Sequence, residues 1–426
     1  MRAEGSPLHW HALHIVSNYG LDEVLKRLVS TGIGTGKPEN ALELELFGVT
    51  PLLFAIFGGF ARTVQCLLDF GVDIEARCDG GTLLRAAVRL GNRKVTRLLL
   101  DRGAEIEARD NIGWTALFHA AQGGRIDIMQ LLLDRGAEVE TLDKRGRTSL
   151  SSGVLRGHID VVQLLLDRGA EVEKRDGTGR APLSLAAESA AVDVMQLLLD
   201  RGAEIETRDD TGRTPLSHAV EARGGDNKPY ILGRRNVERL NDKIPISRYI
   251  APTASIADSV GLLLDRGAEI EARDGGGRTP LCYAVKARTI DTVRLLLEGG
   301  AEIEARDDGG RTPLSHAAES AVFRGSSATV RFLLALPTID IGSEDDEGLT
   351  AIDWAEATSK REFAPEKTPT GPMKTIQAGI FRQKRMESEK IVAILKAALL
   401  ERTRNLLTDG GDGTTLPSNV GHSTTC

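Results

Sequence analysis

The stretch "GRTPLSHAVEA" at residues 212–222 has the local chemistry of a short helix. Thr214 is a favoured N-cap residue, and Pro215 follows at the first helical position, where the missing N–H of proline removes no hydrogen bond. Leu216 and Ala219 then fall on one face of the helix. The sequence therefore predicts a short helix that begins after Thr214 and buries one apolar face.

Copies of this signal recur along the chain with a fixed period. Thr or its substitute stands at positions 50, 82, 115, 148, 181, 214, 279, 312 and 350, so that most steps are 32 or 33 residues long. A second helix follows in each copy, as in "IDIMQLLLDRG" at 126–136, and Gly136 suits the left-handed conformation that ends a helix. Neither helix pair can cover its own apolar face, so neighbouring pairs must stack.

The repeats resemble ankyrin repeats. The resemblance is carried by "GNRKVTRLLLDRGAEIEARDNIGWTALFHAA" at 91–121, by "GRTPLSHAAES" at 310–320 and by their copies over about residues 8–400. The Glu-rich finger "GAEIEARD" is similar to the variant found in ankyrin chains of filamentous fungi. The resemblance implies an all-α fold, an α-solenoid of stacked helix pairs with short β-hairpin fingers, and a non-enzymatic scaffold that binds a protein partner.

This sequence departs from the family pattern at two positions of the repeat. The usual His after "TPL" is mostly Ser, at Ser184, Ser217 and Ser315, which implies a weaker hydrogen bond between repeats. The usual Asn of the finger is replaced by Glu at positions 107, 140, 173, 206, 271 and 304. The second departure implies that the finger lacks the side-chain amide that usually braces it.

Two interruptions divide the predicted array. The single 65-residue step leaves a basic insertion inside one repeat, and residues 360–386 separate the first helix of the last unit from a terminal helix at about 387–404. The predicted parts are a degenerate N-terminal capping repeat with its connection, ankyrin repeats, an insertion loop, further ankyrin repeats, an interrupted C-terminal capping repeat and a disordered tail. Their ranges are 1–44, 45–223, 224–254, 255–342, 343–405 and 406–426.

The bulk composition narrows the class of protein. The chain has 426 residues, a net charge of −7 and a pI near 5.8, which argues against bulk affinity for nucleic acid or an anionic membrane. It has no apolar stretch long enough to span a membrane and no apolar core of a signal peptide. Its four cysteines, at 66, 78, 282 and 426, show no paired spacing. We therefore expect a monomer of the cytoplasm, the nucleus or both.

The alternative function is a metal- or nucleotide-dependent enzyme that uses "HWHALH" or "TGIGTGKP", and the acidic finger is a separate candidate for binding calcium. The finger carboxylates Glu105 and Glu107 alternate along an arm, whereas calcium ligands converge. "TGIGTGKPE" at 31–39 lacks two residues of a phosphate-binding loop and follows a helix. "HWHALH" at 9–14 has no fourth zinc ligand near it in sequence. No catalytic residue, cofactor or metal site is predicted.

Histidines recur at one position of the repeat, at His119, His218 and His316. No Ser or Cys nucleophile with an orienting acid accompanies them at a consistent spacing. We expect these side chains to pack in the stack with their polar atoms satisfied by neighbours.

The finger surface is then the candidate binding site. Trp114 is either an exposed anchor beside a stripe of arginines or packed onto the neighbouring finger, and these alternatives stay open. The predicted partner-binding residues are Trp114, Asn111, Ile112, Arg145, Arg147, Arg180, Arg213, Arg278, Arg311 and Arg156. A transcriptional coregulator is one form of such a scaffold, because basic clusters at 233–235 and 381–385 resemble nuclear-localisation signals.

Overall fold

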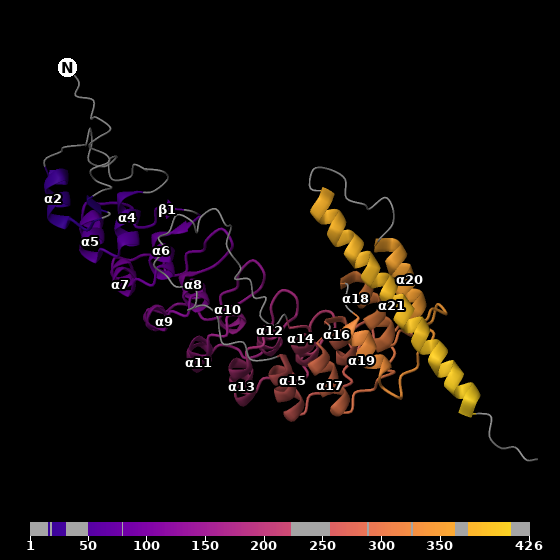
Figure 1. Ribbon diagram of the computed structural model, residues 1–426. Coiled ribbons are helices and arrows are strands. Elements are labelled where there is room, and N and C mark those ends of the chain that lie inside the picture. Colours follow the sequence, from indigo (N-terminus) through magenta and orange to yellow (C-terminus); the bar gives the residue numbers. More distant parts are fainter. Residues whose placement is uncertain are drawn as a thin grey trace, which may run out of the picture. The chain divides into compact units, whose positions relative to one another are not determined.

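The structure is a computed structural model (Figure 1). It describes residues 16–17, 19–30, 50–78, 80–222, 256–287, 289–324, 327–362 and 374–409. The chain forms two compact units, one up to Glu269 and one from Ile270.

Two rows of stacked helices build the first unit (Figure 1). One row contains the first helix of each pair: α4 (Pro51–Gly58), α6 (Leu83–Arg89), α8 (Ala116–Gln122), α10 (Ser149–Leu155), α12 (Pro182–Glu188) and α14 (Pro215–Glu221). The other contains the second helices: α2 (Asp22–Ser30), α5 (Ala61–Asp69), α7 (Arg93–Asp101), α9 (Ile126–Asp134), α11 (Ile159–Asp167), α13 (Val192–Asp200) and α15 (Ile256–Asp265). The predicted all-α solenoid is confirmed.

The first helices begin where the sequence predicts. Thr82 and Thr148 accept hydrogen bonds at their Oγ1 atoms from the backbone N–H three residues on, each at 3.2 Å. Thr214 makes the same cap, and Pro215 occupies the first turn after it. Each cap satisfies one backbone donor that a helix start otherwise leaves without a partner.

The core is aliphatic, as the scarcity of aromatic residues requires. Leu216, Ala219 and Val220 of α14 have no exposed surface, and the second helices bury residues such as Val162 and Leu165 of α11 to the same degree. Small residues on the first helices let neighbouring helices approach closely. Apolar burial between repeats is therefore the main force that holds the stack.

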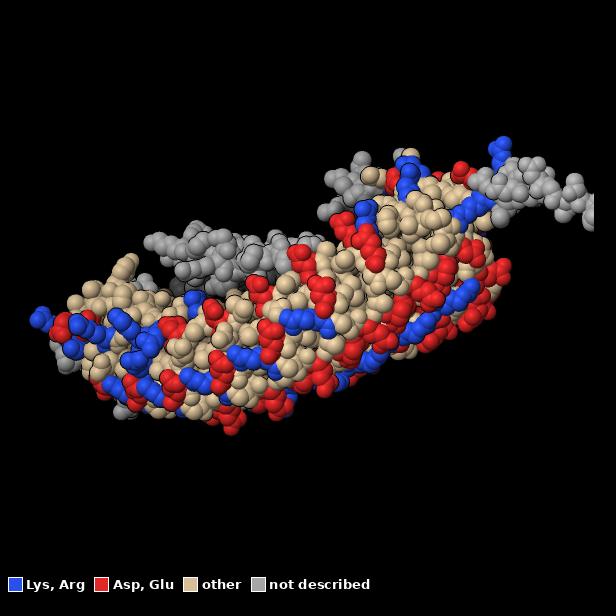
Figure 2. Space-filling view, turned by 90° about the horizontal axis from the view of Figure 1, so that it is seen from below, with Lys and Arg blue, Asp and Glu red and all other residues tan. Residues whose placement is uncertain are grey.

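Ion pairs connect the ends of successive second helices in the first unit. In each Asp-Arg-Gly terminus the Arg contacts the Asp of the preceding repeat, as in Arg102–Asp69 at 2.8 Å and Arg135–Asp101 at 2.7 Å. The same contact recurs as Arg168–Asp134, Arg201–Asp167 and Arg266–Asp200. Figure 2 shows basic and acidic side chains alternating in rows on this face. Because these pairs are exposed, each contributes only about 0–1 kcal/mol.

The fingers are tight loops rather than long hairpins. Among the described residues, strands are assigned only to β1 (Arg77–Cys78) and β2 (Gly81–Thr82), which pair in antiparallel register. Elsewhere two backbone hydrogen bonds close the tip, as from Asp143 N to Arg147 O at 2.9 Å and from Gly146 N to Asp143 O at 3.0 Å.

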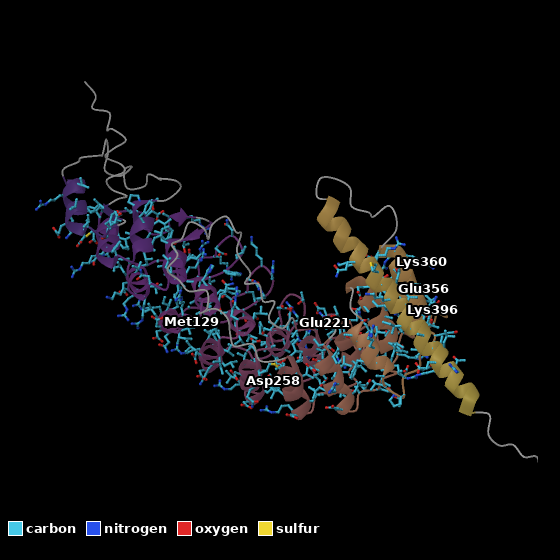
Figure 3. All side chains as sticks on the ribbon, in the orientation of Figure 1. Met129, Glu221, Asp258, Glu356, Lys360 and Lys396 are labelled. Carbon is cyan, nitrogen blue, oxygen red and sulfur yellow. The ribbon has the colours of Figure 1, made fainter. Side chains whose placement is uncertain are left out.

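The second unit continues the helix pairs and ends in a long helix. Its elements are α16 (Pro280–Ala287), α17 (Ile290–Glu298), α18 (Pro313–Arg324), α19 (Ala328–Leu334), α20 (Ala351–Glu362) and α21 (Lys374–Asp409). Helix α21 packs against α18, α19 and α20. Lys396 of α21 contacts Glu356 of α20 at 2.6 Å, and Lys360 contacts the same carboxylate (Figure 3).

The terminal helix differs from its predicted bounds of about 387–404. Residues 374–386, predicted as part of an interruption, and 406–409, predicted as part of a tail, belong to α21. After Pro372 the segment contains no further proline before residue 409, so nothing in it forces a helix to stop. The other interruption begins after Glu221 and ends before Ile256, and residues 224–254 lie outside the described part of the chain.

One loop between paired helices carries a strained residue. Gly91, Gly124 and Gly157 occupy the left-handed region at this position, with φ of 74°, 63° and 66°. The next repeat has Ala190 there, with φ of 52°. The Cβ of an L-residue is disfavoured in this region.

We expect Ala190→Gly to raise the free energy of unfolding by about 0.5–1 kcal/mol, because glycine adopts this backbone conformation without steric strain. The measurement is urea denaturation followed by far-UV circular dichroism. Ala187→Gly in the neighbouring α12 is the matched control and should lower stability by about 1 kcal/mol or more. A loss of stability in both variants would contradict the strain at Ala190.

Candidate functional site

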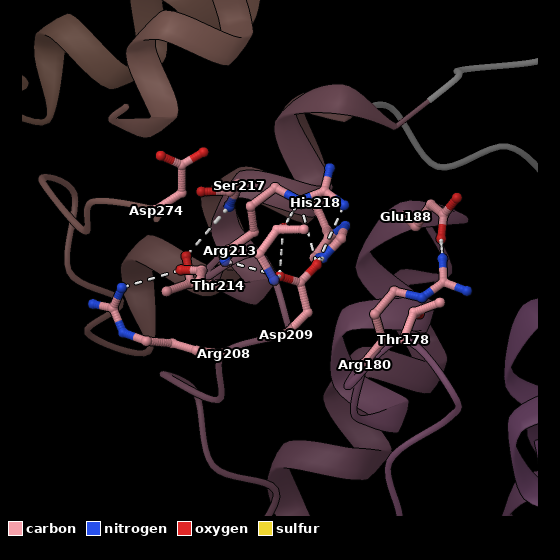
Figure 4. A network of polar contacts seen from close by, with 12 residues as sticks. Thr178, Arg180, Glu188, Arg208, Asp209, Arg213, Thr214, Ser217, His218 and Asp274 are labelled. Atoms are coloured by element: carbon pink, nitrogen blue, oxygen red, sulfur yellow. Dashed lines mark hydrogen bonds and ion pairs between the residues drawn. The ribbon is translucent and has the colours of Figure 1, made fainter. Parts of the chain in front are cut away.

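Most fingers are built around a buried aspartate. In Asp209, Oδ1 accepts hydrogen bonds from the backbone N–H groups of Thr211 at 2.8 Å and Arg213 at 3.0 Å (Figure 4). Its Oδ2 lies 3.0 Å from His218 Nε2 and also accepts from the Arg213 guanidinium. One carboxylate thereby fixes both the loop and the first helix that follows.

The same arrangement recurs in other fingers. The ninth residue after the Asp is a ring that hydrogen-bonds to Oδ2 in the pairs Asp110–His119, Asp209–His218, Asp274–Tyr283, Asp307–His316 and Asp345–Trp354. The three histidines are buried, as predicted, and their Nε2 atoms are satisfied by the finger. The pairs hold the finger on its helix.

Burial and hydrogen bonding set the protonation of these pairs. Burial alone raises the pKa of Asp209, but the hydrogen bonds from Thr211 and Arg213 and the charge of His218 outweigh it and lower the pKa to about 2. Burial and the charge of Arg213 lower the pKa of His218. At neutral pH the finger therefore holds a carboxylate beside a neutral imidazole.

The predicted arginine stripe belongs to this finger structure. The guanidinium of Arg147 contacts Asp143 at 2.8 Å, and its side chain is only 18% exposed. Arg180 bridges Asp176 and Glu188, and Arg213, Arg278 and Arg311 make comparable contacts to Asp209, Asp274 and Glu319. These side chains hold fingers in place, so they do not form a row of freely available charges.

Of the two alternatives for Trp114, the structure shows the buried one, in which the ring packs against its neighbours. It is 7% exposed and stacks on Phe118 with ring centroids 4.6 Å apart. Its Nε1 donates to Asp143 of the next finger at 3.1 Å. Trp114 stands at the position that Arg147 occupies one repeat later, so it replaces a finger arginine and is not an exposed anchor.

The tips of the fingers carry the exposed side chains. Asn111, Ile112, Lys144 and Arg145 are all exposed. Neighbouring tips are connected through the backbone, as from Gly177 N to Arg145 O at 2.8 Å. In the first unit the tips form a connected row whose side chains differ from finger to finger. Arg156, at the end of α10, is half-buried.

The prediction that the fingers lose a brace where Glu replaces the usual Asn is wrong. Glu107 Oε1 accepts a hydrogen bond from the backbone N–H of Glu138 in the next repeat at 2.8 Å. A backbone N–H of the next repeat donates the same bond to the side chains of Glu75, Glu140, Glu173, Glu206, Glu271 and Glu304. The carboxylate takes over the bracing role of the amide. Burial raises the pKa of Glu107, Glu173 and Glu304.

The structure supports the prediction of a weaker hydrogen bond where Ser replaces the usual His after "TPL". The Oγ atoms of Ser184 and Ser217 are buried and have no hydrogen-bond partner among the described residues. At these two positions the hydroxyl therefore does not replace the hydrogen bond of a histidine, whereas Ser315 Oγ lies 3.4 Å from Thr312 Oγ1.

The motifs of the alternative enzyme lie outside the described residues, because "HWHALH" and "TGIGTGKPE" fall at 9–14 and 31–39. In the described part of the chain, no group of three or more His, Cys, Asp or Glu side chains is placed to hold a metal ion. No helix described here is long and apolar enough to cross a membrane.

Family comparison agrees with the helix pairs. A model of ankyrin repeats in three copies matches residues 13–110, 107–176 and 251–361, and a model of a single ankyrin repeat matches 178–210. The chain belongs to the ankyrin repeat family. Ankyrin repeats are protein–protein interaction modules. A search of curated proteins finds no match to the chain.

Sequence reasoning missed the aspartate that organises each ankyrin finger. Its signal is present, since Asp precedes Gly-Arg by three residues in most fingers. The ring nine residues later is the second part of that signal, and it varies among His, Tyr and Trp. A motif whose donor changes its residue type is hard to recognise without the contact itself.

We expect His218→Tyr to reduce the loss of folding stability between pH 7 and pH 5. Below about pH 6.5 the unfolded chain binds a proton that the folded His218, with its lowered pKa, does not, so folding stability falls as pH decreases. Tyr283 shows that tyrosine can donate to the finger aspartate at this position. Urea denaturation at pH 7 and pH 5 should give a smaller difference for the variant than for the wild type. Equal differences would contradict the assignment.

The glutamate brace gives a second prediction. Glu107→Ala removes the acceptor for Glu138 N–H and should lower the free energy of unfolding by about 1 kcal/mol. Glu107→Gln keeps a carbonyl acceptor and removes a half-buried charge, so it should match the wild type or exceed it. Urea denaturation at pH 7 measures both, with the exposed Glu105→Ala as control. If Glu107→Gln lowered the free energy of unfolding as much as Glu107→Ala does, the bracing role of Glu107 would be contradicted.

Proposed function

We propose that the chain is a non-enzymatic adaptor that binds a protein partner through its fingertips and the adjoining first helices. The observation that carries the proposal is the contrast between the two parts of a finger. The residues that hold it, such as Asp143 and Arg147, are repeated and engaged within the chain. The exposed tips, from Asn111 and Ile112 to Lys144, change from one finger to the next.

Such a division suits a recognition surface. The scaffold positions require the same side chains in each repeat, so they cannot be varied to fit a partner. Ile112 is 42% exposed and lies beside the exposed Lys144 and Arg145 of the next tip. An apolar side chain next to cations offers both burial and charge complementarity to a partner.

The proposal extends to a monomer of the cytoplasm or nucleus, with a role as a transcriptional coregulator that does not contact nucleic acid itself. The net charge of −7 supports the last point. Lys384 and Arg385 of the basic cluster are exposed on α21, where an import receptor can reach them. Imaging of a fluorescent fusion, with and without Lys384→Ala and Arg385→Ala, tests the nuclear part.

Affinity capture tests the binding surface. We expect the double variant Ile112→Asp, Arg145→Glu to lose proteins that the wild type captures from a lysate of its own organism. Arg97→Glu on the exposed side of α7 repeats the arginine-to-glutamate change away from the tips. Circular dichroism confirms that each variant is folded. An unchanged set of captured proteins in the double variant would show that the tips are not the interface.

A further inference from the structure

An internal ion pair recurs on the first helices of the first unit. The finger arginine reaches a glutamate eight residues later at the end of the following helix. Arg180 Nη1 lies 2.7 Å from Glu188, and Arg213 Nη1 lies 3.1 Å from Glu221. In these repeats one guanidinium serves both the finger aspartate and a carboxylate on the helix.

The repeat of Arg147 lacks this carboxylate. The position eight residues after Arg147 is Leu155, which is half-buried. Arg147 contacts Asp143 through Nε and Nη2, and no carboxylate of the described residues contacts its Nη1. The guanidinium edge that binds Glu188 or Glu221 in the sister repeats therefore has no acidic partner within the described chain.

A second cation lies at the same place. Arg156 follows Leu155 at the end of α10 and is half-buried. Among the described residues no carboxylate pairs with Arg156, and the charge that acts on it is that of Arg147. Burial and this neighbouring cation together lower the pKa of Arg156. Asp143 is the one carboxylate that pairs with either guanidinium among the described residues, so two neighbouring cations share one opposing charge and a further anion bound between them is favourable.

We propose that Arg147 and Arg156 form a docking site for a carboxylate from an acidic segment of a protein partner. This proposal rests on the proposed function. The sister repeats favour a carboxylate, because Arg180 and Arg213 bind Glu side chains through the corresponding atom. Guanidinium groups bind carboxylates with charge-assisted hydrogen bonds, which are stronger than neutral ones. The tip of the same repeat adds two exposed cations, Lys144 and Arg145.

Leu155→Glu is the sharpest test, because it places in this repeat the carboxylate that the next two repeats already have. The introduced carboxylate is expected to pair with Arg147 and so to compete with the carboxylate of a partner. Arg156→Gln removes the second cation without touching the finger. Leu142→Glu, at a leucine that is 40% exposed, and Arg97→Gln, at an exposed arginine of α7, repeat these charge changes elsewhere.

The probe is a fluorescein-labelled peptide that alternates Glu and Ser, measured by fluorescence anisotropy with the full chain. We expect binding that weakens with added salt, and a peptide with Gln in place of Glu should not bind. Leu155→Glu and Arg156→Gln should each weaken binding by about tenfold, which corresponds to the loss of one charge-assisted contact. The two control variants should bind nearly as the wild type does.

Three outcomes would overturn the proposal. The first is a wild type that binds the Glu peptide no better than the Gln peptide. The second is equal binding by wild type, Leu155→Glu and Arg156→Gln. The third is binding only to a peptide with phosphoserine in place of Glu, which would assign the site to phosphorylated partners.

The capture assay separates this proposal from the proposed function. Partners retained by Leu155→Glu and Arg156→Gln but lost from the Ile112→Asp, Arg145→Glu variant would contradict the acidic docking site alone. Partners retained by every variant would contradict binding through the tips and first helices altogether.

Discussion

The buried carboxylate of the finger aspartate constrains most of the residues around it. Burial by itself disfavours its charge, so the charge persists only where several donors surround it. In Asp143 these are two backbone N–H groups and the guanidinium of Arg147, with Trp114 as a further donor. The loop must also turn sharply: Gly146 has φ of 70°, and a Cβ there would lie 2.7 Å from the backbone N of Gly177. Aspartate and glycine thus recur together, and arginine joins them as a further donor in most fingers.

This internal satisfaction determines which parts of the surface remain for a partner. A charge that is already paired within the chain adds little affinity, because binding must first break or share its existing contact. The numerous acidic and basic residues of the helix ends and finger arms are largely of this kind, as Arg102–Asp69 and the Glu107 brace illustrate. The variable tips differ from these residues, and in the first unit Leu155 interrupts the arginine–glutamate pattern of the next two repeats. Departures from the repeat are therefore more informative about binding than the repeat itself.

The helices could be predicted because their signals are local. Thr214 and Pro215 act on the turn that follows them, and the apolar period determines which face is buried. The positions of Trp114 and Glu107 could not be predicted, since their partners, Asp143 and Glu138, lie about one repeat further along the chain. Sequence gives the repeat period, but it does not say which neighbour a side chain points toward. The finger arginines are less exposed than expected for a different reason, since each contacts a carboxylate of its own repeat, as Arg147 does with Asp143 and Arg180 with Glu188.

The contacts between repeats also explain how the array contains a long insertion. Residues 223–255 separate α14 from α15, yet the contacts between second helices continue across this gap in sequence. Glu206 accepts the backbone N–H of Glu269 at 2.8 Å, and Arg266 reaches Asp200 at 3.2 Å, as their counterparts do in uninterrupted repeats. In sequence the insertion falls between the two helices of one pair, whereas the braces connect second helices and finger arms. An added segment at this point therefore leaves each inter-repeat bond in place, so a new surface element can be acquired there without loss of the stack.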